Sequence, residues 1–165
     1  MFKTFILSTA LFLIGCSASG PSYSNLSPSI TEASTGSKII VYRESNFING
    51  TARFWVEMNG IEVCRLHNGS FLIHDVEPGK VTIASSNFGS YGTSRITVNA
   101  KPRKTVYIKM TMNGGRVMAG TLGGAIANAT DEAIEENSGP VYLGEVNAQT
   151  AKTEMANMNY EDGCK

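Results

Sequence analysis

The chain has 165 residues, with 14 basic and 14 acidic side chains and a formal net charge of zero at pH 7. This balance removes the electrostatic case for binding nucleic acid. Residues 37–165 suffice for one domain with its own apolar core, without support from a metal or a disulfide.

Residues 1–15 have the order of a secretory signal peptide. Lys3 precedes an apolar run over residues 5–14 that is too short to span a bilayer as a helix. The run ends in Leu13-Ile14-Gly15-Cys16, which resembles the lipobox of bacterial lipoproteins. The resemblance implies that the Cys16 thiol takes a diacylglycerol and that the chain is cut before it. An ordinary signal peptide with an accidental cysteine is the alternative.

The residues after Cys16 suggest where such a protein would be held. Lipoproteins retained in the inner membrane carry aspartate after the cysteine, whereas this chain has Ser17. The resemblance therefore implies a lipid-anchored protein of the cell envelope, in the outer membrane and facing the periplasm. Residues 16–36 are rich in Ser, Gly, Pro and Thr, which predicts a flexible tether between the lipid and the domain.

Short β-branched and aromatic runs separated by tight turns fill most of the remaining chain. Their even spacing predicts an antiparallel β-sandwich of about seven to eight strands, and an open barrel is the alternative. Residues 149–158 predict a short C-terminal helix. The expected strands cover residues 38–43, 51–58, 61–66, 69–76, 81–86, 94–100, 105–112 and 141–146.

Two turns carry specific predictions. Asn59-Gly60 is typical of a type I′ hairpin, in which both central residues have positive φ. Pro78-Gly79 predicts a type II turn over residues 77–80, with Gly79 at the position that requires positive φ. In the strand before the hairpin, Phe54, Val56 and Met58 alternate toward the core and Trp55 faces the other side.

A Gly/Ala-rich stretch over residues 114–129 interrupts the β pattern, and Gly120 and Gly124 are spaced for close helix approach. We expect a helical insertion or hairpin that covers one face of the sandwich. The alternatives are an exposed patch for self-association or a partner, or a segment that dips into the lipid surface. With the outlying aromatic residues it forms a candidate interaction patch: Gly120, Leu122, Gly124, Ile126, Trp55, Phe88 and Tyr91.

Cys64 and Cys164 are the cysteines that lipidation leaves over. In an oxidising periplasm such a pair can form a disulfide. The alternative is a buried Cys64 with a free Cys164, and the sequence leaves both open.

No catalytic or metal-binding pattern is visible. His67 and His74 are the only histidines, and their spacing matches no common zinc motif. The nucleophile-elbow pattern Gly-x-Ser-x-Gly is also missing. We therefore expect no catalytic residue, no metal, and no cofactor beyond the covalent lipid on Cys16.

Several short motifs in this order resemble a family of bacterial lipoproteins known as domain of unknown function 2846. The motifs are Tyr42-Arg43, the hairpin that ends at Gly60, Leu66-His67-Asn68-Gly69-Ser70-Phe71, Pro78-Gly79, Thr105-Val106-Tyr107 and Ala151-Lys152-Thr153-Glu154. The chain departs from the family at Lys80, where histidine is common, and at Cys64, where a small residue is usual. The family is similar to sandwich domains of the PEGA and transthyretin-like kind, which bind or present and do not catalyse. The resemblance implies an anchored sandwich without a known activity.

Anchoring and the missing catalytic motifs together favour a non-enzymatic lipoprotein that binds or stabilises another envelope component. Its partners would be membrane lipid, through the acyl anchor, and an envelope protein or glycan. A glycan- or peptidoglycan-binding module is the second hypothesis, and an envelope hydrolase is the third.

Overall fold

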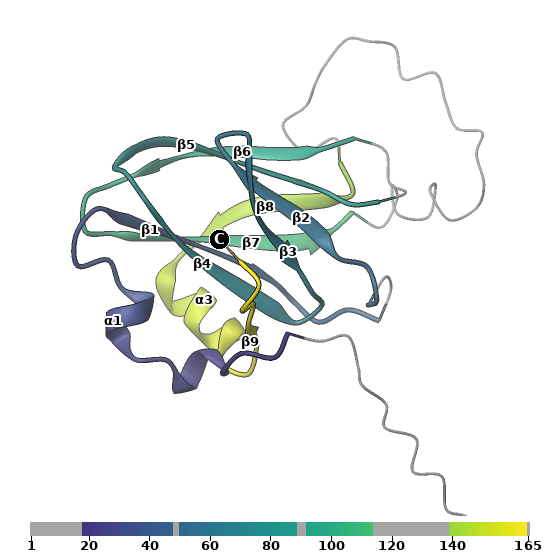
Figure 1. Cartoon of the computed structure of the whole chain (residues 1–165), viewed down its shortest axis with the longest axis horizontal. Helices are drawn as coiled ribbons and strands as arrows, with labels where there is room; N and C mark the ends of the chain where they lie inside the picture. The colour runs from purple at the N-terminus through teal and green to yellow at the C-terminus, as the bar shows by residue number, and fades with distance from the viewer. Residues whose placement is uncertain (1–17, 48–49, 89–91, 114–138, 165) are drawn as a thin grey trace, which may run out of the picture.

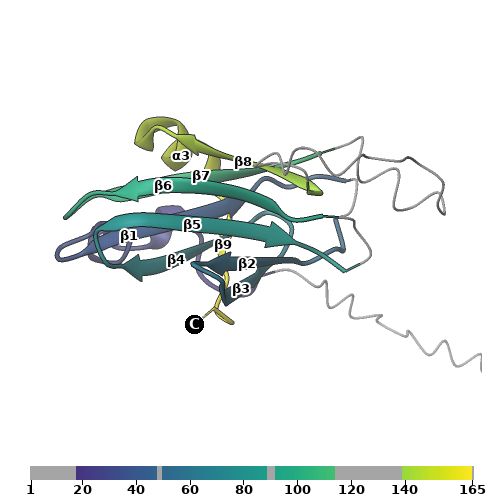
Figure 2. The same ribbon diagram turned by 90° about the horizontal axis from the view of Figure 1, so that it is seen from above.

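The computed structural model describes residues 18–47, 50–88, 92–113 and 139–164. Within these ranges the chain forms nine strands in two sheets, with few and short helices (Figure 1). The five-stranded sheet has the order β8-β7-β1-β4-β9, and the four-stranded sheet has the order β3-β2-β5-β6. The sheets lie face to face (Figure 2), so the predicted mainly-β sandwich is confirmed.

The elements follow the predicted ranges closely, and the strands over residues 61–66, 94–100, 105–112 and 141–146 coincide with them. The helices are η1 Tyr23–Asn25, α1 Pro28–Thr31 and α3 Ala148–Met155. The strands are β1 Ser37–Arg43, β2 Phe54–Met58, β3 Ile61–Leu66, β4 Ser70–Val76, β5 Gly79–Ser86, β6 Ser94–Ala100, β7 Thr105–Met112, β8 Val141–Val146 and β9 Asn159–Tyr160.

Strand β1 is buried on both faces, which explains the apolar run Ile39-Ile40-Val41-Tyr42 at its centre. Ile39 and Val41 point into the core between the sheets. Ile40 and Tyr42 point the other way, into a second core that also contains Met155 of α3. The five-stranded sheet is thus the middle layer of three, between the four-stranded sheet and a layer built from α3 and the N-terminal residues.

Strand β2 shows the predicted alternation. Phe54, Val56 and Met58 are buried in the core between the sheets, whereas Trp55 and Glu57 are only partly covered on the outer face. Fully burying a side chain of this size stabilises a fold by roughly 1.5–3 kcal/mol, so the inner face of β2 contributes strongly to stability.

Two pairs in the five-stranded sheet are parallel. Strand β1 pairs antiparallel with β4 but parallel with β7, and β9 pairs parallel with β4. These partners lie far apart in the sequence, where no hairpin turn dictates the direction of pairing. The remaining ladders, including every pair of the four-stranded sheet, are antiparallel.

The two predicted turns have different outcomes. Asn59 and Gly60 both have positive φ, at 50° and 80°, as a type I′ hairpin requires. The prediction of a type II turn at residues 77–80 is wrong. Gly79 has φ 143°, far from the value near 80° of such a turn, and it is already the first residue of β5. Its φ nevertheless lies in the region that favours glycine.

The predicted flexible tether is also wrong for residues 18–36. This segment contains η1 and α1, buries Ala18 and Tyr23, and forms an isolated bridge between Ser22 and Asn159. Its polar composition suggested too little apolar surface to become ordered. The structure compensates with backbone hydrogen bonds to the end of the chain, which composition does not reveal.

Candidate functional site

The last residues of the chain hold the first described ones against the fold. We call residues 158–164 the terminal strap. The N–H of Gly20 donates to the Tyr160 carbonyl at 3.1 Å, and the N–H of Tyr160 donates to the Pro21 carbonyl at 2.9 Å. The N–H of Tyr23 donates to the Met158 carbonyl at 3.0 Å. The two ends of the chain therefore stabilise each other.

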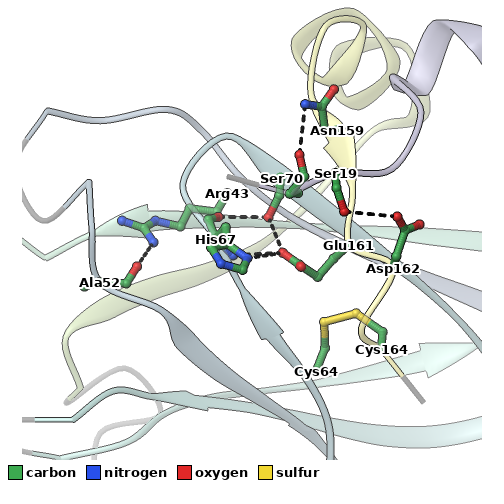
Figure 3. A network of polar contacts seen from close by, with 11 residues as sticks. Ser19, Arg43, Ala52, Cys64, His67, Ser70, Asn159, Glu161, Asp162 and Cys164 are labelled. Carbon is green, nitrogen blue, oxygen red and sulfur yellow. Dashed lines mark hydrogen bonds and ion pairs between the residues drawn. A yellow bond between two sulfur atoms is a disulfide. The ribbon is translucent and has the colours of Figure 1, made fainter. Parts of the chain in front are cut away.

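This pairing continues to the first described residue. The side-chain amide of Asn159 donates to the Ala18 carbonyl at 3.2 Å, and the Ser19 hydroxyl donates to Asp162 at 3.3 Å (Figure 3). Ala18 is only 4% exposed. The first described residue is therefore held in the fold. Cys16, two positions before it, lies outside the described residues.

A disulfide fixes the terminal strap at its end. Cys164 is bonded to Cys64 of β3, with 4.5 Å between the two Cα atoms and 100 residues between them in sequence. Strand β3 is the edge of the four-stranded sheet, whereas β9 is the edge of the five-stranded sheet. The strap thus connects both sheets. Of the two alternatives for Cys64 and Cys164, paired or free, the structure contains the disulfide.

A buried carboxylate connects the strap to the turn between β3 and β4. Glu161 is 7% exposed. One of its oxygens accepts hydrogen bonds from the His67 N–H at 3.2 Å, from His67 Nδ1 at 2.7 Å and from the Ser70 hydroxyl at 3.4 Å (Figure 3). Because a carboxylate accepts, the tautomer with a proton on Nδ1 is the one that satisfies this contact.

The histidine, serine and carboxylate do not form a catalytic relay. Such a relay needs the serine hydroxyl on the ring nitrogen that faces away from the carboxylate. Here Ser70 is fully buried, and its hydroxyl bonds to the His67 carbonyl at 2.9 Å and to Glu161. The cluster is arranged to hold the strap and offers no accessible nucleophile.

A shallow hollow of about 330 Å³ lies beside this cluster, with Arg53, Arg65 and His67 in its lining. Its acidic residues already have partners. Glu62 pairs with Arg65 at 2.8 Å, and Glu161 pairs with His67. Within the described part of the chain no group of three or more His, Cys, Asp or Glu side chains is placed to hold a metal ion.

A second polar network lies between the middle sheet and α3. The Tyr42 hydroxyl donates to Glu154, and the Lys109 ammonium contacts Glu154 at 2.8 Å and Glu44 at 2.9 Å. The Lys109 hydrogen bond, followed by that of Tyr42, lowers the pKa of Glu154. Burial and the Glu154 contact raise the pKa of Tyr42. The network fixes α3 on the sheet.

Arg43 is buried in the fold next to Phe54. Its Nη1 donates to the Ala52 carbonyl at 2.6 Å, and its guanidinium lies 4.6 Å from the centre of the Phe54 ring. Burial lowers the pKa of Arg43 to about 10, so the side chain still carries its charge at neutral pH. The Tyr42-Arg43 motif thus has a structural role here: each residue joins β1 to a neighbouring segment.

The predicted interaction patch is only partly described. Trp55 is half-buried on the outer face of β2, and the Arg65 guanidinium lies 5.7 Å from the centre of its ring. Phe88 is 92% exposed. Tyr91, Gly120, Leu122, Gly124 and Ile126 lie outside the described residues.

Apart from the possible Cys64–Cys164 disulfide, no sequence pattern predicts the strap. Asn159, Glu161 and Ala18 belong to no motif, and their contacts join residues more than 90 positions apart. Tyr23 is the one aromatic residue in the predicted tether, and it is the residue that could have indicated that this segment packs on the domain. It packs edge-on against Phe71, with 5.4 Å between the ring centres.

In the described residues no helix is long and apolar enough to cross a membrane. Comparison with known proteins found no protein-family model, curated protein or solved structure that matches the chain. The resemblance to the lipoprotein family therefore stays a prediction, and the function has to be argued from the residues themselves.

Proposed function

We propose that this chain is a lipoprotein of the cell envelope, anchored through Cys16, that binds or stabilises another envelope component without catalysing a reaction. The envelope face we favour is the periplasmic side of the outer membrane, because serine follows the cysteine. The observation that carries the proposal is the order of features along the sequence: Lys3, then an apolar run, then Leu13-Ile14-Gly15-Cys16.

The disulfide supports export. Structural disulfides persist in oxidising compartments such as the periplasm and are rare in the cytosol. Cys64 and Cys164 sit within bonding distance, and their link closes the contact between the terminal strap and β3. A cytosolic protein would gain little from a strap that depends on this bond.

The way the polar groups are used supports a non-catalytic role. Several buried or half-buried ionisable groups pair with each other: His67 with Glu161, and Lys109 with Glu154 and Glu44. Each pair joins two segments of the fold. These groups are therefore occupied in holding the fold together, which favours a structural or binding role over catalysis.

Replacement of Cys16 tests the anchor. We expect wild-type protein to incorporate radiolabelled palmitate and to fractionate with membranes. Cys16→Ser should incorporate none and should remain as the uncleaved precursor or move to the soluble periplasm. Ser17→Ala is the matched control and should be acylated normally. A Cys16→Ser protein that is processed and still sediments with membranes would show that the lipobox assignment is wrong.

Partner capture tests the binding role. Crosslinking in intact envelopes, followed by purification of the lipidated chain, should yield a defined envelope protein whose recovery is unaffected by muramidase treatment. Recovery of muropeptides in place of a protein would favour the glycan-binding hypothesis. Release of cleaved glycan or peptide by the purified chain would favour the hydrolase hypothesis and contradict the proposal.

A further inference from the structure

The register of the strands shows which parts of the fold lie at the same end as Ala18. In the five-stranded sheet, Arg43 at the end of β1 pairs with Ser70 at the start of β4, and Ser70 pairs with Asn159 of β9. Asn159 in turn holds the Ala18 carbonyl. The end of β1, and hence the loop that starts at Glu44, therefore lies at the same end of the sheet as Ala18, the first described residue.

The four-stranded sheet contributes to the same end. Arg43 donates to the Ala52 carbonyl just before β2, and Trp55 near the start of β2 pairs with Ser86 at the end of β5. The loop that begins at Asn87 therefore emerges there too. We call this the anchor end of the sandwich; in Figure 1 the start of β2 lies at this end, toward the right.

Two aromatic side chains project from the anchor end. Phe47 is 101% exposed and Phe88 is 92% exposed, which makes them the two most exposed large hydrophobic residues of the described chain. The residue before Phe47 is held in place, because Asn68 accepts from the Asn46 N–H at 2.9 Å and donates to the Asn46 carbonyl at 3.0 Å. An exposed arginine, Arg53, follows in the same loop.

The distance to the anchor is short. Cys16 and Ala18 are two positions apart in the sequence. An extended chain spans at most about 3.6 Å per residue, or roughly 7 Å over these two positions. Neighbouring strands lie about 4.8 Å apart and packed sheets about 10 Å apart, so both phenylalanines lie within roughly 20–25 Å of the attachment point. A lipid on Cys16 would therefore hold this end against the headgroups.

We propose that the anchor end docks directly on the bilayer that holds the acyl chains, with Phe47 and Phe88 inserted at headgroup level. Apolar aromatic side chains with a nearby cation are the usual composition of surfaces that lie in a membrane interface. The proposal rests on the anchoring of Cys16 proposed above. It gives the domain a fixed orientation, with the Asn59-Gly60 hairpin and α1 directed away from the membrane and available to a partner.

Depth-dependent fluorescence quenching tests the orientation. The full chain, acylated in cells, is reconstituted in vesicles of phosphatidylglycerol and phosphatidylcholine with brominated acyl chains. A Trp55→Phe background removes the only native tryptophan. Into it we place Phe47→Trp, Phe88→Trp or Ile61→Trp. Ile61 is 69% exposed beside the hairpin at the far end, which makes it the matched control.

We expect the brominated lipid to quench tryptophan at positions 47 and 88, with a blue shift of emission, and to leave position 61 unchanged. Equal quenching at all three positions, or none at any, would overturn the docking proposal. Palmitate incorporation is measured on the same samples. Acylated protein without quenching at 47 and 88 contradicts docking alone, whereas protein that is never acylated contradicts both the anchor and the docking.

A second measurement separates insertion from mere proximity. Phe47→Ser together with Phe88→Ser should leave palmitate incorporation unchanged, yet expose the anchor end to added protease in vesicles. Ile61→Ser should not. If the double variant and wild type are cleaved at the same rate, the two phenylalanines are not inserted and the proposal fails.

Discussion

The backbone N–H of Gly20 donates to the carbonyl of Tyr160 at 3.1 Å, which joins residues near the two ends of the chain in one hydrogen bond. A Cβ on Gly20 would lie 2.5 Å from that same carbonyl oxygen. The close approach therefore requires glycine at this position. The contact makes the order of the first described residues dependent on the terminal strap, and the strap depends on its disulfide.

Loss of the disulfide should destabilise the whole domain. A crosslink across about 100 residues removes chain entropy from the unfolded state, and such bonds typically contribute 2–4 kcal/mol. We expect Cys64→Ser with Cys164→Ser to lower the free energy of unfolding in urea by about this amount. Hydrogen exchange should quicken most at the Gly20 and Tyr23 amides. Treatment of wild type with a thiol reductant is the control and should reproduce the shift, whereas unchanged exchange at Gly20 would contradict the role assigned to the strap.

Gly79 should resist replacement although there is space around it. A Cβ at this position would meet no atom within 4 Å, but φ 143° strains any L side chain. We expect Gly79→Ala to cost about 1–3 kcal/mol in thermal or urea unfolding. Gly144 in β8 is equally open and has no positive φ, so Gly144→Ala should be neutral or slightly stabilising. Equal effects at both positions would mean that the conformation at Gly79 carries no strain.

Glu154 should give the stability of the domain a pH dependence on the acid side. Its contact with Lys109, and then that with Tyr42, lowers its pKa below the ordinary value of 4.5. The ionised carboxylate therefore stabilises the fold above about pH 4.5, and this contribution is lost as the pH falls through the lowered pKa. We expect unfolding curves of Glu154→Gln to depend less on pH below 4.5 than those of wild type. Glu145→Gln, an exposed position in β8, is the control and should keep the wild-type slope.

The His67–Glu161 contact should show a large coupling energy. Glu161 is buried and accepts from His67 through both the backbone and the ring. Removing the ring leaves a buried carboxylate short of a donor, so His67→Ala should destabilise the fold by about 1–3 kcal/mol. A double-mutant cycle with Glu161→Ala isolates the pair. Effects that simply add would show that the two side chains do not interact in solution.

The strands were predictable because local rules determine them. The alternation of Phe54, Val56 and Met58, together with the Asn59-Gly60 turn, is encoded within a few residues, and the structure follows it. The two-residue strand β9 and the parallel pairing of β1 with β7 have no such local sign. Both depend on contacts between segments that are far apart in the sequence, and a single sequence does not show which distant segments meet.

The candidate sites were harder to predict for the same reason. Cysteine counting left Cys64 and Cys164 either paired or free, because sequence does not measure the distance between them. The partner of His67 is 94 residues away and belongs to no motif. The exposure of Phe47 was missed because a single aromatic residue in a polar loop looks the same whether it is buried or not.

The contacts between residues 18–23 and the terminal strap also limit the order in which parts of the fold can form during synthesis. The Ala18 carbonyl and the Asn159 amide are 141 residues apart. The ribosome therefore makes Asn159 long after Ala18. Until then residues 18–22 lack the partners that they find on the terminal strap, although Tyr23 can already pack on Phe71. Strands β1 to β8 can meanwhile pair among themselves. Residues 18–22 can therefore gain their hydrogen bonds to the strap only after the rest of the sandwich has been made, and a chain truncated before Asn159 would keep its sandwich core but lose these contacts.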